Sequence, residues 1–444
     1  MMNVNAKYLL LTAVVLGLVS VPSLGAEKKS WKDDTMLVSR QGDQTVVRGL
    51  KGDKVLFKHK DAQLAVEWAM ANARTTLVQA GKYVVNDSID APRDGVTLII
   101  DQGAVIKMNL DADPKTDIDF RPSGSQQLVP IIYIKDRNNV RVYYFGNIIP
   151  SAKKKPEGSI LGYAQTFPIV FDGRGDFPTP LPPRNPFGGN KPRRTFGING
   201  GTLVATGTVH NFFLCLDAKN MQIPLVCPVG SGSDAVFGME GCENGVIGMV
   251  ANLAKEKGGK GGETVDLNAC CGNITFDTLI GERSHEILDC NASQAGIKET
   301  VSIGRASTVF TLTPNHGARW TLNPLVPKRL MCKKLTILSG DDPAKVGLVR
   351  GRNRKNKLAS VVDIGDPKTK GKPPADVKIG EVEWLAEAVD VKRTVTIPKL
   401  PDALPRFTVK ATVEVTLKDG SKKVYDKAVE IDVRTGGGKP EKKE

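Results

Sequence analysis

The sequence predicts an all-β protein, in which a parallel β-helix solenoid is followed by a small antiparallel β-sandwich. Three observations support this prediction. From Asp61 to Met108, a short amphipathic helix precedes three short apolar strands that are separated by turns. Further along, a Gly or Asn residue recurs before a strand at intervals that suit one coil of a solenoid. From Val377 onward, apolar and polar residues alternate with a period of two, which is typical of antiparallel strands.

The first segment indicates how the solenoid begins. Its helix is marked by small and apolar residues with helical spacing: Ala62, Leu64, Ala65, Trp68 and Ala69. A strand ending at Ala80-Gly81 follows, then Tyr83–Val85, then Gly95–Ile100. This order resembles the N-terminal cap and first rung of the pectin-lyase-like right-handed β-helix superfamily. The resemblance implies a right-handed solenoid of a kind mostly used outside the cytoplasm on long, charged polysaccharides.

The repeats set the expected limits of the solenoid. The turn residues that precede strands are Gly95, Asn139, Asn220, Gly245, Asn273 and Gly296. The strand residues after the last four of them are 25, 28 and 23 residues apart, which is the length of one coil. We therefore expect a parallel β-helix over residues 61–330, with residues 26–60 forming a cap that covers its first coil.

The remaining segments differ in composition. Residues 151–194 are rich in proline, which cannot donate to a strand ladder, so they are predicted to be a loop insertion. Residues 331–376 are expected to be a basic connector, since 328–357 contain ten Lys or Arg and two Asp. Residues 377–434, with a hairpin signal at Asp419-Gly420, predict an immunoglobulin-like β-sandwich. Residues 435–444 are expected to be a disordered tail.

The first 25 residues are typical of a signal peptide. Lys7 precedes an apolar run of fourteen residues, Tyr8 to Val21, and small Ser23 and Gly25 suit cleavage after Gly25. An uncleaved N-terminal anchor is the alternative. We expect a secreted or periplasmic protein with no integral membrane segment after cleavage. Export argues against a nucleic-acid partner, so the net charge of +14 favours an anionic polysaccharide.

The chain contains seven cysteines, six of them within the predicted solenoid. Their spacing matches no zinc site. We interpret them as small apolar core residues, while disulfides remain an open alternative in an oxidising compartment.

The resemblance raises the question of lyase chemistry, which needs a base and a cation that neutralises a uronate carboxylate. Asp266 and Asp289 each lie eight residues before a marked strand position, so they are expected to stack on neighbouring coils and to hold Ca²⁺. The candidate catalytic residues are Arg283, His285 and Lys298, and Glu240 is a candidate substrate-binding residue. The alternative is that these six residues are ordinary outward-facing charges of a solenoid.

Two functions therefore remain open. The first is an exported protein that binds extracellular or cell-envelope polysaccharide without catalysis. The second is a polysaccharide lyase that cleaves an acidic glycan by β-elimination. Polygalacturonase-type hydrolases share motifs of which this chain has only fragments, so no catalytic residue is transferred from them.

Overall fold

A computed structural model describes most of the chain after residue 33, within the compact unit of residues 31–444. The described residues are 34–115, 118–119, 127–154, 163–175, 196–209, 211, 213–230, 235–253, 263–268, 272–282, 286–291, 300–309, 319–322, 329–338, 340, 342–351, 359–364 and 376–434. The predicted signal peptide and the predicted C-terminal tail lie outside these residues. None of the helices in the described ranges has the length and apolar character needed to cross a bilayer.

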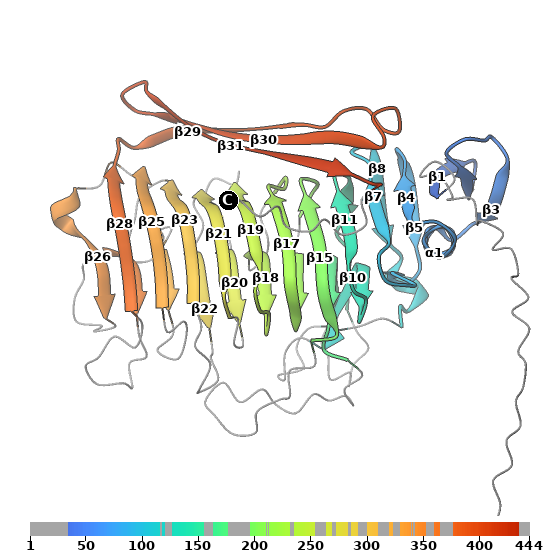
Figure 1. The fold of residues 1–444 in the computed structure, drawn as a ribbon, viewed down its shortest axis with the longest axis horizontal. Helices are drawn as coiled ribbons and strands as arrows, with labels where there is room; N and C mark the ends of the chain where they lie inside the picture. The colour runs from blue at the N-terminus through green and yellow to red at the C-terminus, as the bar shows by residue number, and fades with distance from the viewer. Residues whose placement is uncertain are drawn as a thin grey trace, which may run out of the picture. The chain divides into compact units, whose positions relative to one another are not determined.

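Two large sheets dominate the described part of the chain (Figure 1). The 13-stranded sheet contains, in spatial order, β28 (Asp376–Trp384), β25 (Arg329–Leu338), β23 (Thr300–Val309), β21 (Ile274–Glu282), β19 (Val246–Leu253), β17 (Ala218–Val226), β15 (Ile198–Ala205), β11 (Val140–Tyr144), β7 (Thr97–Ile100), β4 (Thr75–Val78), β1 (Thr35–Gln41), β2 (Gln44–Gly49) and β3 (Val55–His59). The 12-stranded sheet contains β26 (Val346–Gly351), β27 (Ala359–Ile364), β24 (Arg319–Leu322), β22 (Glu286–Asn291), β20 (Glu263–Asn268), β18 (Ala235–Glu240), β16 (Phe213–Leu216), β14 (Tyr163–Asp172), β10 (Gln127–Lys135) and β6 (Ile89–Asp90), with β13 (Ala152–Lys154) beside β14 and β9 (Ile118–Asp119) beside β10.

The connectivity relates these two sheets to each other. From β14 to β25, consecutive strands alternate between the 12-stranded and the 13-stranded sheet. From β14 to β23, each strand pairs in parallel with the strand two places further along the chain, as β16 does with β18 and β17 with β19. A third parallel sheet joins β12 (Asn147–Ile149), β8 (Ala104–Met108) and β5 (Gly81–Val85). The chain is therefore all-β with mostly parallel strands, which is compatible with a β-helix.

Left-handed turn residues connect the strands of one sheet to those of the other. Asn139, Asn220 and Asn273 have φ values of 56°, 55° and 54°. Asn tolerates this conformation better than other residues with a side chain. The prediction of turn residues before strands is confirmed for Asn139 and Asn273, whereas Asn220 is left-handed but lies within β17. Before β19, Asn244 rather than Gly245 is left-handed. Stacked amides add a ladder, since Asn273 Nδ2 donates to Asn244 Oδ1 over 3.2 Å.

The N-terminal part contains the predicted helix. It is α1 (Ala62–Asn72), and the Asp61 side chain caps it by accepting from the backbone N–H of Gln63. The helix buries Ala62, Ala65, Val66, Ala69 and Met70. Strands β1, β2 and β3 form antiparallel hairpins, and β1 extends the parallel sheet by pairing with β4. Two short 3-10 helices, η1 (Leu110–Ala112) and η2 (Pro343–Lys345), lie in connections.

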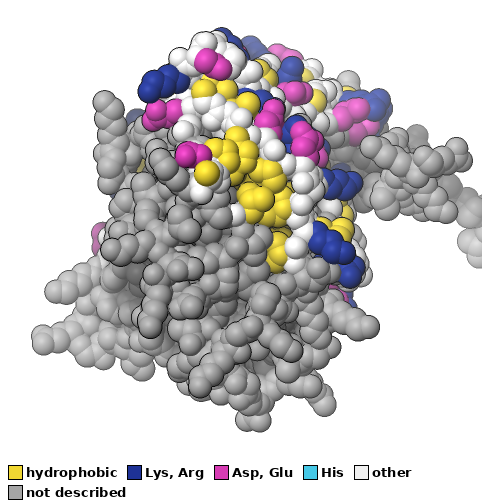
Figure 2. Space-filling view, turned by 90° about the vertical axis from the view of Figure 1, so that its left-hand side faces the viewer, with side chains coloured by type: hydrophobic (Ala, Val, Ile, Leu, Met, Phe, Trp, Pro, Cys, Tyr) yellow, Lys and Arg dark blue, Asp and Glu magenta, His cyan; other side chains and the backbone are white. Residues whose placement is uncertain are grey.

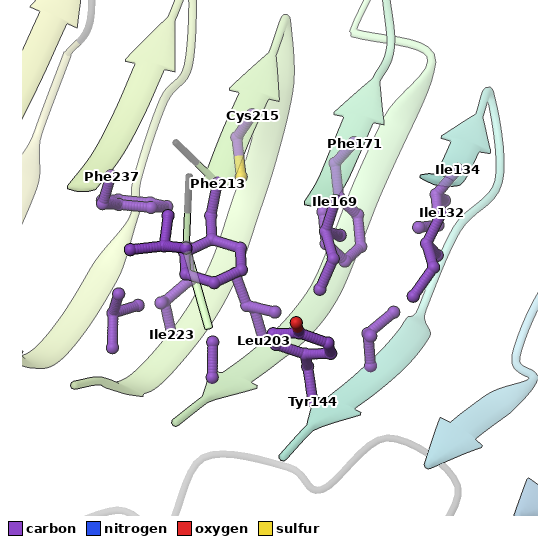
Figure 3. Packing of buried hydrophobic residues seen from close by; sticks show 14 of the residues in the cluster. Ile132, Ile134, Tyr144, Ile169, Phe171, Leu203, Phe213, Cys215, Ile223 and Phe237 are labelled. Carbon is purple, nitrogen blue, oxygen red and sulfur yellow. The ribbon is translucent and has the colours of Figure 1, made fainter. Parts of the chain in front are cut away.

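The main core lies between the two large sheets (Figure 3). Tyr144 of β11 and Phe213 of β16 meet edge to face, with ring centroids 5.8 Å apart. Phe213 is also the register partner of Phe237 on β18. Cys215, Cys242 and Cys332 are buried free thiols in this core, which confirms the interpretation of these three as small core residues.

A smaller antiparallel sheet covers the outer face of the 13-stranded sheet. It consists of β29 (Ala388–Thr396), β30 (Arg406–Leu417) and β31 (Lys422–Asp432). Its apolar face packs on that sheet, with Phe407 edge-on to Phe145 at 6.3 Å. Arg393 Nε donates to the Cys227 carbonyl over 2.9 Å. Figure 1 shows β30 running across several strands of the larger sheet.

The C-terminal boundaries differ from the prediction. Parallel pairing continues past residue 330 through β25, β26, β27 and β28, so residues 331–376 contain strands of both large sheets. Residues 376–384 belong to the 13-stranded sheet rather than to the antiparallel module. That module is antiparallel as predicted, but its described residues form three strands, fewer than an immunoglobulin domain has. Period-two alternation does not distinguish a parallel strand with one polar face from an antiparallel one.

The predicted loop insertion is also shorter than expected. Residues 163–172, within the predicted insertion 151–194, form β14, which pairs in parallel with β10. The single proline of this segment, Pro168, has no partner in the register, so its missing N–H interrupts one pairing rather than the strand. Residues 176–195, which hold most of the prolines, lie outside the described residues.

Candidate functional site

The outer face of the 12-stranded sheet carries polar residues in register. Along β10, Ile132 and Ile134 point into the main core, so Tyr133 and Lys135 point outward. The first outward row contains Asp90, Tyr133, Val170, Leu214, Gly238 and Asp266 on successive strands. The second row contains Lys135, Asp172, Leu216 and Glu240. Between the polar positions, Val170, Leu214 and Leu216 belong to a buried apolar cluster. Neighbouring positions in a row are about 4.8 Å apart.

A buried ion pair occupies these rows on β10 and β14. Arg174 donates to Asp172 from Nε over 2.8 Å and from Nη2 over 2.7 Å. Tyr133 Oη donates to the same carboxylate over 2.9 Å. Burial opposes the charge on Asp172, but Arg174 outweighs it and lowers the pKa of that carboxyl. Burial and the adjacent Asp172 raise the pKa of Tyr133. The carboxylate is therefore held ionised and fixed in orientation.

A second carboxyl next to this network titrates in a different range. Asp90 is the register partner of Tyr133, and its backbone N–H donates to Glu67 Oε1 of α1 over 2.9 Å. Although Asp90 is exposed at the surface, the surrounding chain limits the access of water to its carboxyl; this desolvation, then the charges of Glu67 and Asp87, raise the pKa of Asp90 to about 7. Burial also raises the pKa of Glu67. Asp90 can therefore gain or lose a proton near neutral pH.

Two cations lie beside Asp90 on β10 and the turn that follows. The exposed Lys135 and the half-buried Arg137 both lower the pKa of Asp90. Arg137 is held there because its Nε donates to the carbonyl of Ala91 over 3.3 Å. Carboxyl groups pushed to different pKa values are the usual arrangement for acid–base work. The cluster of Glu67, Asp90, Lys135 and Arg137 thus offers a proton-exchanging group and two cations at the surface.

Replacing Glu67 by Gln should lower the pKa of Asp90 while keeping an oxygen that accepts from its backbone N–H. In the native chain Asp90 binds its proton more tightly when folded. Its stabilising contribution is therefore complete below its ordinary pKa of 3.8 and is lost as pH rises through about 7. As the pH rises from about 4 to about 7, we expect the melting temperature of Glu67→Gln to fall less than that of the native chain. Melting temperatures measured across this range test it, with the distant Glu243→Gln as control; parallel curves for native and Glu67→Gln proteins would contradict it.

The structure brings part of the predicted site together. Asp266 and Asp289 are register partners on β20 and β22, as expected from the sequence. Asp266 is 6% exposed and lies opposite Gly238, and Glu240 is two residues further along β18 and 7% exposed. A diagonal pair of this kind is separated by about 7–8 Å. Arg283, His285 and Lys298 lie outside the described residues, so their predicted catalytic roles remain predictions.

The Asp266–Asp289 pair falls short of a complete calcium site. Carboxylate oxygens suit Ca²⁺, but the ion takes six to eight oxygen ligands. Within the described ranges, no group of three or more His, Cys, Asp or Glu side chains is placed to hold a metal ion.

Sequence reasoning did not find Asp90, Glu67 or the Tyr133–Asp172–Arg174 network. Arg174 falls within residues 151–194, which the prolines indicated to be a loop, so no strand position was expected beside it. The alternation of Tyr133 and Lys135 between apolar residues is a signal for the outward face of β10. No local pattern reveals that Glu67 of a helix approaches Asp90 of a strand.

No protein-family model matches the chain, and no curated protein matches it significantly. Function must therefore be argued from the geometry of the chain itself.

Proposed function

We propose that this chain is an exported β-helix protein that binds an extracellular or cell-envelope polysaccharide through the outer face of its 12-stranded sheet. The proposal rests on one observation above others: Asp90 and Lys135 stand exposed at the β6–β10 end of that face, beside the Tyr133–Asp172–Arg174 network. A linear polymer offers hydroxyl and carboxyl groups that such a group of acidic and basic side chains can meet.

The entrance to the binding surface is the cluster of Glu67, Asp90, Lys135 and Arg137. Lys135 and Arg137 can pair with the carboxylates of an acidic glycan, and Arg can do so in a bidentate manner. Asp90 and Glu67 can accept hydrogen bonds from sugar hydroxyls. The net charge of +14 attracts polyanions over longer distances, and salt screens this attraction.

A panel of neutral and uronate polysaccharides tests the proposal by affinity electrophoresis of the full chain. We expect one or more acidic polymers to retard migration, with weaker retardation as ionic strength rises. Neutral polymers should have little effect. Migration unchanged by every polymer would contradict polysaccharide binding, and equal retardation by neutral polymers would contradict the role of charge.

Lyase activity is the second candidate, favoured by one observation. Asp90 has a pKa of about 7 beside two cations, which supplies a proton acceptor next to groups that neutralise a carboxylate. Arg283, His285 and Lys298 remain the candidate catalytic residues from the sequence. β-Elimination yields an unsaturated sugar, so ultraviolet absorbance of the same mixtures, with and without Ca²⁺, separates turnover from binding. Retardation with flat absorbance supports a binding protein.

A further inference from the structure

Among the described strands, β28 forms one end of the 13-stranded sheet. β28 pairs with β25 on one side, and within the described ranges no strand pairs with its other edge. A strand edge of this kind presents unpaired backbone N–H and C=O groups and is a template for pairing with another chain. The opposite end of the sheet is different, because α1 and the β1–β3 hairpins cover it.

The same end leaves apolar side chains incompletely covered. Val377, Ile379, Val382 and Trp384 pack against the main core but are only partly buried. Figure 2 looks onto this end and shows a band of hydrophobic side chains bordered by acidic and basic ones. A solenoid end normally needs a cover for such residues.

The sequence of β28 is self-complementary about the midpoint between Gly380 and Glu381. Val377 and Ile379, before this midpoint, and Val382 and Trp384, after it, all pack against the main core. The alternation of inward and outward side chains therefore shifts by one residue between Gly380 and Glu381. If two copies of β28 pair antiparallel about this point, Ile379 lies opposite Val382, and Val377 lies opposite Trp384. Lys378 then lies opposite Glu383. These three pairs match apolar with apolar or cation with anion, while Gly380 lies opposite Glu381 at the midpoint.

We propose that the occupant of this edge is a second copy of the chain, bound through antiparallel pairing of β28 with β28 around a two-fold axis. Two-fold dimers are the commonest closed assemblies, and a two-fold interface requires a self-complementary surface. The pairing joins two 13-stranded sheets and covers both apolar bands. It also forms two Lys378–Glu383 pairs, although Glu383 already accepts from Lys423 Nζ over 2.7 Å within its own chain.

Sedimentation of the full chain over a range of concentrations tests the proposal. We expect reversible dimers, and we expect Lys378→Glu to raise the dimer dissociation constant about tenfold or more, since two attractive pairs become two like-charge pairs. Lys378→Arg should leave it nearly unchanged. Lys410→Glu makes the same charge change on the exposed face of β30 and should also leave it unchanged.

Amide hydrogen exchange provides a second measurement that does not depend on a variant. Exchange in residues 377–384 should slow as dimers form, while the protection of β17 stays constant. A chain that remains monomeric at all concentrations overturns the proposal. So does a dimer that Lys378→Glu does not weaken, because that dimer uses another surface.

Discussion

Phe213→Ala is expected to lower the free energy of unfolding by about 3–5 kcal/mol. Phe213 is fully buried in the main core, where it meets Tyr144 from the opposite sheet and Phe237 from the next strand (Figure 3). Removing the ring leaves a cavity between two sheets whose backbones are tied by ladders of hydrogen bonds, so the site can relax only partly.

Chemical denaturation measures this loss directly. Val246→Ala is the matched control, since Val246 also lies in a parallel strand but is 50% exposed. Its effect should stay within about 1 kcal/mol. Equal losses in the two variants would contradict the assignment of Phe213 to a close-packed interior.

Val413→Asp is expected to release the C-terminal sheet from the 13-stranded sheet. Val413 is fully buried in the cluster that joins β30 to residues such as Leu225 and Met249 of the larger sheet. A carboxylate at this position would be buried without a designed partner, at a cost of several kcal/mol. Detaching the small sheet would bring this carboxylate into water. Detachment therefore costs less free energy in the variant than in the native chain, even though it exposes the apolar face that the small sheet covers.

Limited proteolysis reports this release. We expect Val413→Asp to be cut within residues 385–434 much faster than the native chain and to bind a hydrophobic dye. Lys410→Asp places the same carboxylate on the exposed face of the same strand and should resemble the native chain. Native-like resistance in Val413→Asp would show that the small sheet does not depend on this contact.

The sequence was sufficient to predict features that depend on neighbouring residues along the chain. Helix α1 is marked by helical spacing and an Asp cap, and Asn139 and Asn273 mark left-handed turns because few other residues adopt this conformation. The predicted pairing of Asp266 with Asp289 also agrees with the register.

Features that depend on distant contacts were not predictable in this way. β28 looks like an antiparallel strand because its partner, β25, is recognisable only once the sheet is assembled. The raised pKa of Asp90 depends on desolvation and on Glu67, which is 23 residues earlier and on a different type of element. Asp172 and Arg174 became a candidate only when the register placed Tyr133 beside them.

Binding of an acidic polysaccharide to the native chain and to a Lys135→Ala/Arg137→Ala variant is the most direct test of the proposed surface. Both side chains lie outside the main core, so the variant should fold normally. We predict a loss of affinity of about tenfold or more, because two charge-assisted contacts disappear. A Lys392→Ala/Lys410→Ala variant, altered on the C-terminal sheet, should bind like the native chain. Equal binding by the native chain and the Lys135→Ala/Arg137→Ala variant would show that the polymer binds elsewhere.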